Sequence, residues 1–201
     1  MLDELRIARL TGDALETHIP DLARLRIRVF RDFPYLYDGT PEYEERYLRT
    51  YIDSPESVIV LVFHGDQVVG ASTAVPAEHE TAAIQEPLKK HGYDPRRVLY
   101  LGESILLPEY RGRGLGVRFF QEREDHARSL ERIDWTCFCA VERPADHPRR
   151  PTEYVPLDQF WTRRGYTKHP ELRTTLSWKE LDEPEESPKP MTFWLKRLTR
   201  P

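Results

Sequence analysis

Cysteine and long apolar runs are scarce in this 201-residue sequence. The two cysteines, Cys137 and Cys139, would point to the same face of a strand, which is a poor arrangement for a mutual disulfide. No run approaches the roughly 20 apolar residues that span a bilayer, and the N-terminal MLDELRIARL lacks the apolar core of a signal peptide. We therefore expect reduced thiols, a cytoplasmic location and no membrane partner.

Positive charge is not in excess either. Lysine and arginine total 30 against 34 aspartate and glutamate residues, which gives a net charge of -4. Nucleic-acid affinity comes largely from phosphate neutralisation, so a nucleic-acid partner is the weakest functional hypothesis and we expect none. Local basic clusters could still hold one anionic ligand.

The hydrophobic pattern nevertheless supports a core, and the length predicts one domain with extensions. Strands are expected over residues 4–9, 57–63, 67–75, 97–107, 132–141 and 173–181, and helices over 20–33, 41–52, 79–91, 114–130 and 157–164. This order predicts a mixed α/β sheet with a parallel strand–helix–strand crossover in its second half.

We divide the chain into a domain over residues 1–181 and a tail over 182–201. Residues 182–190 (DEPEESPKP) are acidic and proline-rich, which is typical of an extended linker. Residues 191–198 are apolar at Met191, Trp194, Leu195 and Leu198, which is helical spacing. We expect this segment to dock on its own domain or to cross to a second subunit, as in a homodimer.

Glycine is also scarce, yet three of the ten glycines fall at positions 112, 114 and 116, in the stretch PEYRGRGLGVRFF. Such a loop before a helix exposes backbone amides that bind anions, and Arg111 and Arg113 add positive charge. A tight turn with solvated arginines is the alternative. No Gly-Lys-Ser/Thr follows, and the third position of a GxGxxG pattern holds Val117 or Phe119, so neither a P-loop nor a dinucleotide fingerprint fits.

Three segments in order carry a family resemblance. Ser104-Ile-Leu106-Leu-Pro108-Glu-Tyr-Arg111 resembles the lead-in L-x-V-x-P-x-x-R, while Arg111, Gly114 and Gly116 match Arg/Gln-x-x-Gly-x-Gly/Ala. Phe160-Trp-Thr-Arg-Arg-Gly165-Tyr166 is similar to the ending L-Y-x-K-x-G-F. Over roughly residues 55–180 the chain thus resembles the GCN5-related N-acetyltransferases (the GNAT superfamily), and residues 5–55 fit their first strand and helix pair.

The resemblance implies a mixed, mostly antiparallel sheet with helices on both faces, and acetyl-CoA or another acyl-CoA as co-substrate, without a metal. The pyrophosphate would lie on the backbone of Gly112, Arg113, Gly114, Leu115, Gly116 and Val117, with Arg111 in support. The pantetheine arm and the thioester carbonyl would lie along the backbone of Ser104, Ile105, Leu106 and Leu107, an oxyanion-type arrangement. The reaction would be direct attack by the amine of a small molecule, amino acid or peptide, which makes the chain an acyl-CoA-dependent N-acyltransferase.

The proton chemistry needs a base and sometimes an acid. Glu103 is the one charge in the strand phase that includes Leu99, Leu101, Ile105 and Leu107, so burial should raise its pKa and suit it to act as the general base. The alternative is a structural carboxylate paired with an arginine such as Arg28 or Arg31.

The acid is less evident, because Trp161 occupies the position of the family's tyrosine. Tyr154 is the nearest tyrosine and His147 lies in the loop before it; otherwise the thiolate leaves unassisted. This departure keeps a non-catalytic acyl-CoA-binding module as the alternative function. We expect Cys137 and Cys139 to be buried apolar residues, with a covalent acyl-cysteine as the lesser hypothesis.

The acceptor side is expected among Arg31, Tyr35 and Tyr37, which suit a polar small molecule, including one that carries a carboxylate. The alternative is that these rings only cover the helix pair. The long loop 142–156 contains Arg143, Arg149 and Arg150 and could form a lid that recognises an anionic acceptor.

Overall fold

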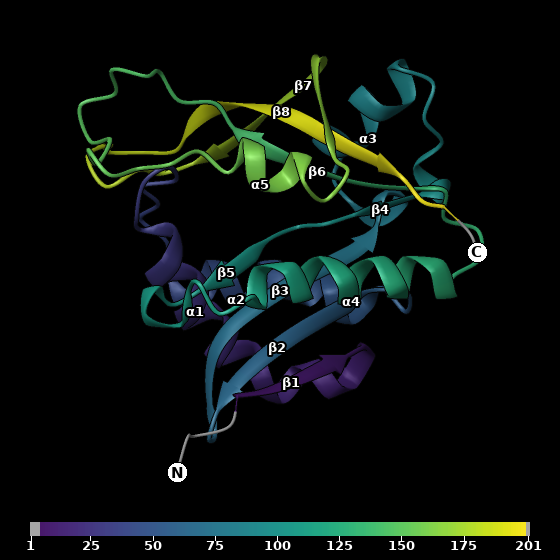
Figure 1. The fold of residues 1–201 in the computed structure, drawn as a ribbon. Helices are drawn as coiled ribbons and strands as arrows, with labels where there is room; N and C mark the ends of the chain where they lie inside the picture. Colours follow the sequence, from purple (N-terminus) through teal and green to yellow (C-terminus); the bar gives the residue numbers. More distant parts are fainter. Residues whose placement is uncertain (1–4, 200–201) are drawn as a thin grey trace.

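The computed structural model describes residues 5–199 and contains one eight-stranded sheet in the order β1-β2-β3-β4-β6-β8-β7, with β5 paired to β3 (Figure 1). The strands are β1 (Leu5–Leu10), β2 (Val58–His64), β3 (Gln67–Pro76), β4 (Val98–Tyr100), β5 (Ser104–Leu106), β6 (Trp135–Val141), β7 (Thr167–Trp178) and β8 (Ser187–Arg197). The α-helices are α1 (Ile19–Phe30), α2 (Pro41–Asp53), α3 (Ala82–Lys90), α4 (Leu115–Ser129) and α5 (Asp158–Thr162). Strands β4 and β6 are parallel, and the other paired strands are antiparallel. The predicted mixed, mostly antiparallel sheet with a parallel crossover is confirmed.

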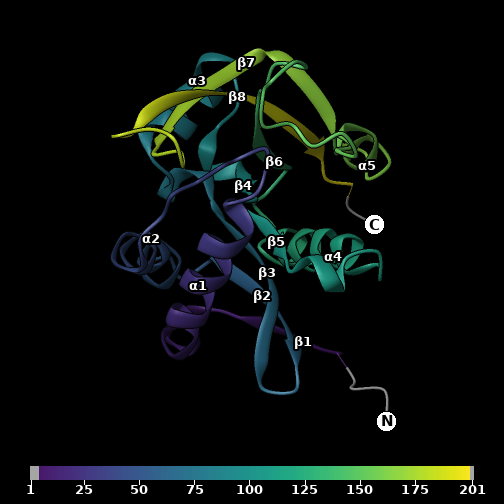
Figure 2. The same ribbon diagram turned by 90° about the vertical axis from the view of Figure 1, so that its left-hand side faces the viewer.

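Helices cover both faces of the first half of the sheet, as predicted. Strand β2 reads VIVLVFH and its first six residues are buried, because helices pack on both of its faces. Figure 2 shows α1 and α2 against one face and α4 against the other. Helix α2 begins where the sequence predicts, with the Thr40 hydroxyl accepting the Tyr43 amide at 3.4 Å and Pro41 in the first turn.

The prediction of a helix over residues 191–198 is wrong. These residues belong almost entirely to β8, which lies between β6 and β7 inside the sheet. The apolar spacing fits a helix, but every residue from Met191 to Leu195 is at most 3% exposed, and such a continuous buried run is typical of an inner strand. The acidic segment 182–190, expected as a linker, forms the turn between β7 and β8 and the start of β8. The tail is therefore part of its own domain's sheet.

The long strand expected over residues 97–107 is interrupted. Tyr100 pairs with Val75 and Ser104 pairs with Ser72, so residues 101–103 face only residues 73 and 74 of β3. One extra residue on one strand is a β-bulge, which bends that strand and ends its pairing on one side.

In the described part of the chain, no helix has the length and apolarity to cross a membrane.

Candidate functional site

The bulge makes β5 diverge from β6. Strand β4 pairs in parallel with the start of β6, and the Leu101 amide donates to the Cys137 carbonyl at 2.7 Å. Beyond this point β5 pairs only with β3, while the rest of β6 pairs only with β8, among the described strands. Figure 1 shows the two strands opening toward the end of the molecule where α4 begins. Both strands therefore present an unpaired edge to the space between them.

The free edge of β5 is formed by alternate residues. Thr73 donates its amide to the Glu103 carbonyl at 3.1 Å, and Leu107 donates to the Val69 carbonyl at 3.0 Å. Because the backbone groups of alternate residues point to opposite sides of a strand, those of Ser104 and Leu106 point away from β3. The Arg111 side chain donates to the Leu106 carbonyl at 3.2 Å, which agrees with this orientation. An extended chain that carries amides could pair with these groups as an added strand does.

The glycine-rich loop places free amides at the same end. Gly112 and Gly114 have φ of 77° and 80°, the left-handed region that favours glycine. Within residues 5–199 the amides of Gly112, Arg113 and Gly114 donate to no protein group, and those of Leu115 and Gly116 precede the first helical hydrogen bond of α4. A Cβ at Gly116 would lie 3.2 Å from the Phe160 ring. Five consecutive amides at a helix N-terminus fit a pyrophosphate group.

Arg123 holds the bulge from the α4 side, a role that the sequence analysis missed. Its side chain is 1% exposed and donates to the carbonyls of Thr73 at 3.2 Å and Glu103 at 3.0 Å, and to the Ser104 hydroxyl at 2.8 Å. Burial lowers the pKa of Arg123 to about 10, so the guanidinium stays charged at neutral pH. A buried arginine on a helix facing a strand gives no local sequence signal of this contact.

Glu103 is buried, as its strand phase predicts, but it is not isolated. Its Oε2 lies 2.6 Å from the Arg26 guanidinium, which also pairs with the fully buried Glu44. The partner is thus Arg26 and neither Arg28 nor Arg31. Oε1 of Glu103 and Oε1 of Glu44 are both buried and have no hydrogen-bond partner. Glu103 therefore combines the ion pair of the structural alternative with one carboxylate oxygen that has no hydrogen-bond donor among the described residues.

A second carboxylate, Glu80, lies near Glu103 and was not anticipated. It follows β3 in the segment before α3, and its side chain accepts the Thr81 amide at 3.2 Å. Burial raises the pKa of Glu80 to about 7, and the charge of Glu103 contributes to the rise. The polar letters around position 80 look like an ordinary loop, so only the three-dimensional proximity reveals this group.

The residues predicted for the acceptor side occupy different environments. Burial raises the pKa of Tyr35, and nearby Cys139, Glu103 and Tyr154 raise it further. Burial and a hydrogen bond to Glu44 raise the pKa of Tyr37. Arg31 lies outside this group, because its side chain is 58% exposed and lies 3.6 Å from Asp38.

The long loop 142–157 closes against residues 31–40. Arg143 donates to the Pro34 carbonyl at 2.6 Å and to the Tyr35 carbonyl at 3.2 Å, and it pairs with Glu180 at 2.5 Å. Arg149 pairs with Asp182. The loop is thereby fastened to the turn between β7 and β8, and these two cations have partners within the protein.

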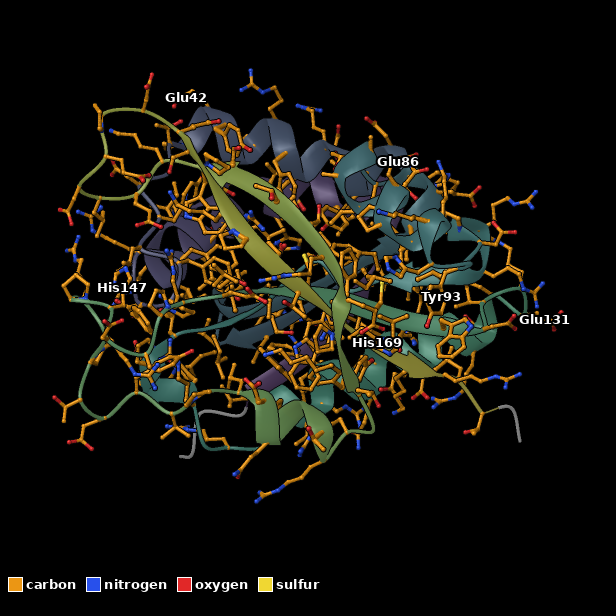
Figure 3. All side chains as sticks on the ribbon, turned by 90° about the horizontal axis from the view of Figure 1, so that it is seen from above. Glu42, Glu86, Tyr93, Glu131, His147 and His169 are labelled. Carbon is orange, nitrogen blue, oxygen red and sulfur yellow. The ribbon has the colours of Figure 1, made fainter. Side chains whose placement is uncertain are left out.

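The candidates for the acid lie on this loop. The half-buried Tyr154 packs edge-on against Phe33 at 4.7 Å between ring centroids. The Arg150 guanidinium lies 4.9 Å from the centroid of the Tyr154 ring. His147 lies on the outer side of the loop (Figure 3), 5.5 Å from the Phe33 ring. Both residues therefore pack against Phe33, and Tyr154 is the closer of the two.

Trp161 and the cysteines belong to the packing beside β6. The Trp161 ring contacts Phe138 and Trp194 at 5.0 and 5.1 Å between centroids. Both cysteines are free and buried, and burial raises the pKa of Cys139 to about 12, which does not favour an acyl-cysteine. No group of three or more histidine, cysteine, aspartate or glutamate residues in the described part of the chain could hold a metal ion.

The comparisons with known proteins agree with this geometry. The family model described as "Acetyltransferase (GNAT) family" matches residues 22–148. Among solved structures, a candidate acetyltransferase from Acinetobacter baylyi has 13% identity, a TM-score of 0.65 and coverage of 100% of this chain and 97% of that one. The ribosomal-protein-alanine N-acetyltransferase from Brucella melitensis has 14% identity, a TM-score of 0.61 and coverage of 96% and 99%.

A candidate acetyltransferase from Salmonella typhimurium, solved with its cofactor acetyl-CoA, has 9% identity, a TM-score of 0.60 and coverage of 97% and 95%. At these identities the structures show a shared fold. No curated protein matches the sequence. The family match covers most of the chain, including the bulge, the glycine-rich loop and α4, so the chain belongs to the GNAT family of acetyltransferases.

Proposed function

We propose that this chain transfers an acetyl group from acetyl-CoA to the amine of a small molecule, amino acid or peptide by direct attack. The observation that carries the proposal is the convergence of three features at one end of the sheet. These are the free edge of β5, the free amides before α4, and Glu103 beside the bulge. Acetyl-CoA supplies an activated thioester carbon, and the protein positions it and manages the amine's proton.

The residues divide into two binding segments. The amides of residues 112–116 hold the pyrophosphate, and Arg111 and Arg113 add charge at its edge. The Val117 amide, which the sequence predicts with them, donates instead to the Gly114 carbonyl at 3.0 Å. The backbone of residues 104–107 holds the pantetheine arm, with the groups of Ser104 and Leu106 as its hydrogen-bond partners. The backbone supplies most of these contacts, which suits a cofactor whose shape is constant.

On the acceptor side, Glu103 accepts the proton of the amine, directly or through a water, through its unpaired Oε1. The nitrogen–carbon bond then forms while the carbon–sulfur bond breaks, and the thiolate leaves with the electron pair of the broken bond. It takes a proton from Tyr154 or from solvent. Tyr35 and Tyr37 contact the acceptor, and Arg31 lies at the rim of the same region.

Turnover with a panel of amines tests this function, with the free thiol of CoA as the readout. Glu103→Gln should lower kcat by about 10²–10⁴, whereas Glu45→Gln, on the exposed side of α2, should match the wild type. The Kd for acetyl-CoA should be the same in all three proteins. An unchanged pH–rate profile in Glu103→Gln would remove Glu103 from the mechanism. Binding of acetyl-CoA without turnover of any amine would instead favour the non-catalytic binding module.

A further inference from the structure

Three of the cations that would recognise an anionic acceptor, Arg31, Arg143 and Arg149, already lie beside carboxylates, whereas the Arg150 guanidinium lies 4.9 Å from the Tyr154 ring centroid. Arg143 and Arg149 bind Glu180 and Asp182, and Arg31 lies beside Asp38, which Lys179 also contacts at 2.9 Å. An acceptor carboxylate at one of these three arginines would have to displace these partners. Of the arginines predicted to recognise an anionic acceptor, only Arg150 could therefore bind a carboxylate without displacing a carboxylate of the described residues.

The inner wall carries an excess of acid. Two carboxylates, those of Glu44 and Glu103, pair with the single guanidinium of Arg26 on the α1–α2 face of the sheet, and the charges of Glu103 and Arg26 both act on the pKa of Glu80. A second guanidinium, that of Arg123, lies on the opposite face and is bound to backbone carbonyls. Oε1 of Glu44 and Oε1 of Glu103 are buried without a donor. Buried acceptors of this kind are costly unless a donor or a cation reaches them.

Aromatic rings complete the surroundings of this acid cluster. The Arg26 guanidinium lies 4.4 Å from the Tyr47 ring centroid and 5.2 Å from that of Phe30. The hydroxyls of Tyr47 and Tyr51 are 3.1 Å apart. Burial raises the pKa of both phenols, and the charge of Glu103 raises it further. Carboxylates among aromatic rings are the surroundings that ammonium groups prefer.

We infer that the acceptor is a primary amine that arrives as an ammonium ion and carries no carboxylate next to its amino group. The inference rests on the proposed function and names its substrate class. The ammonium gives one proton to Oε1 of Glu103, and the neutral amine attacks the acyl carbon. The carbon–sulfur bond breaks, and the products are the N-acetylated amine, CoA thiol and one proton released to solvent.

Matched pairs of acceptors test the inference: tyramine against tyrosine, and histamine against histidine. Members of a pair differ only by the α-carboxylate. In each pair that is turned over, kcat/KM should be at least about tenfold higher for the amine, because a carboxylate near the acid cluster is repelled. Glu80→Gln should reduce this ratio several-fold, whereas Glu86→Gln, on the outer side of α3 (Figure 3), should leave it unchanged.

The outcomes separate this inference from the proposed function, because acetyl-CoA binding is measured by calorimetry on the same samples. Equal or faster turnover of the amino acids would overturn the inference and leave acetyl transfer intact. A ratio that stays constant in Glu80→Gln would remove the acid cluster as its cause. Acetyl-CoA binding without turnover of any amine in the panel would overturn the inference as well, and absence of acetyl-CoA binding would sink the proposed function itself.

Discussion

Replacing Arg123 by methionine should destabilise the fold and weaken acetyl-CoA binding together. Methionine keeps helix propensity and much of the volume while removing the guanidinium. The carbonyls of Thr73 and Glu103 each keep one backbone donor, from Gly102 and Thr73 respectively, so each loses its second hydrogen bond. The Ser104 hydroxyl loses its bond as well.

The size of the effect follows from these contacts. With the bond that Arg123 also donates to the Phe119 carbonyl at 3.1 Å, four hydrogen bonds at about 1 kcal/mol each give a loss of about 4 kcal/mol in the free energy of unfolding. Relief of the buried charge offsets part of this loss, while the imperfect fit of methionine adds to it. Without Arg123 the bulge is free to relax, so the Kd for acetyl-CoA should rise by about tenfold or more.

Urea unfolding and calorimetry measure the two effects. Arg118→Met is the matched control, because Arg118 lies on the same helix, is 54% exposed and forms only a surface pair with Glu122 at 2.7 Å. It should change the free energy of unfolding by no more than about 0.5 kcal/mol. A loss below about 1 kcal/mol in Arg123→Met, or an unchanged acetyl-CoA affinity, would refute the role of Arg123 in holding the bulge.

Three further predictions concern the loop, the acid cluster and the thiols. Gly112→Ala should cost about 1 kcal/mol, because φ is 77° and its surroundings are open, and urea unfolding measures this loss. The pKa of Glu80 in the folded state is raised to about 7, so the folded state binds more protons than the unfolded state. The free energy of unfolding should therefore fall by about 1–2 kcal/mol as the pH rises from about 4.5 to 7. Urea titrations across this range should show a flatter pH dependence for Glu80→Gln. Cys139→Ser should retain turnover within about threefold if the buried thiol takes no part in the chemistry, and complete loss in a folded protein would reopen the acyl-cysteine route.

The sequence predicts the features that depend on local chemistry. The glycine-rich loop, the two consecutive strands β2 and β3 and the helix that begins at Pro41 follow from residue preferences within a few positions, and the structure has all three. The burial of Glu103 follows from alternation along one strand. These signals survive folding because no distant contact competes with them.

The remaining features depend on contacts between distant residues. The apolar residues of segment 191–198 have helical spacing, but the segment pairs with β6 and β7 and is therefore part of a strand. The pairing of Arg26 with Glu103, rather than Arg28 or Arg31, depends on which face of α1 meets the bulge. Arg123 and Glu80 acquire their roles in the same way, since Arg123 donates from α4 to Ser104 of β5 and the charge of Glu103 raises the pKa of Glu80.

The most direct test of the central claim is calorimetric titration of the wild type and of Gly114→Val with acetyl-CoA. Gly114 has φ of 80° at the start of α4, a conformation that valine rarely adopts, so the substitution should misplace the amides of the loop. We expect one binding site in the wild type, with a Kd on the order of micromolar to millimolar, and affinity at least about tenfold weaker in the folded variant. Absence of binding in the wild type, or equal affinity in the two proteins, would contradict the central claim.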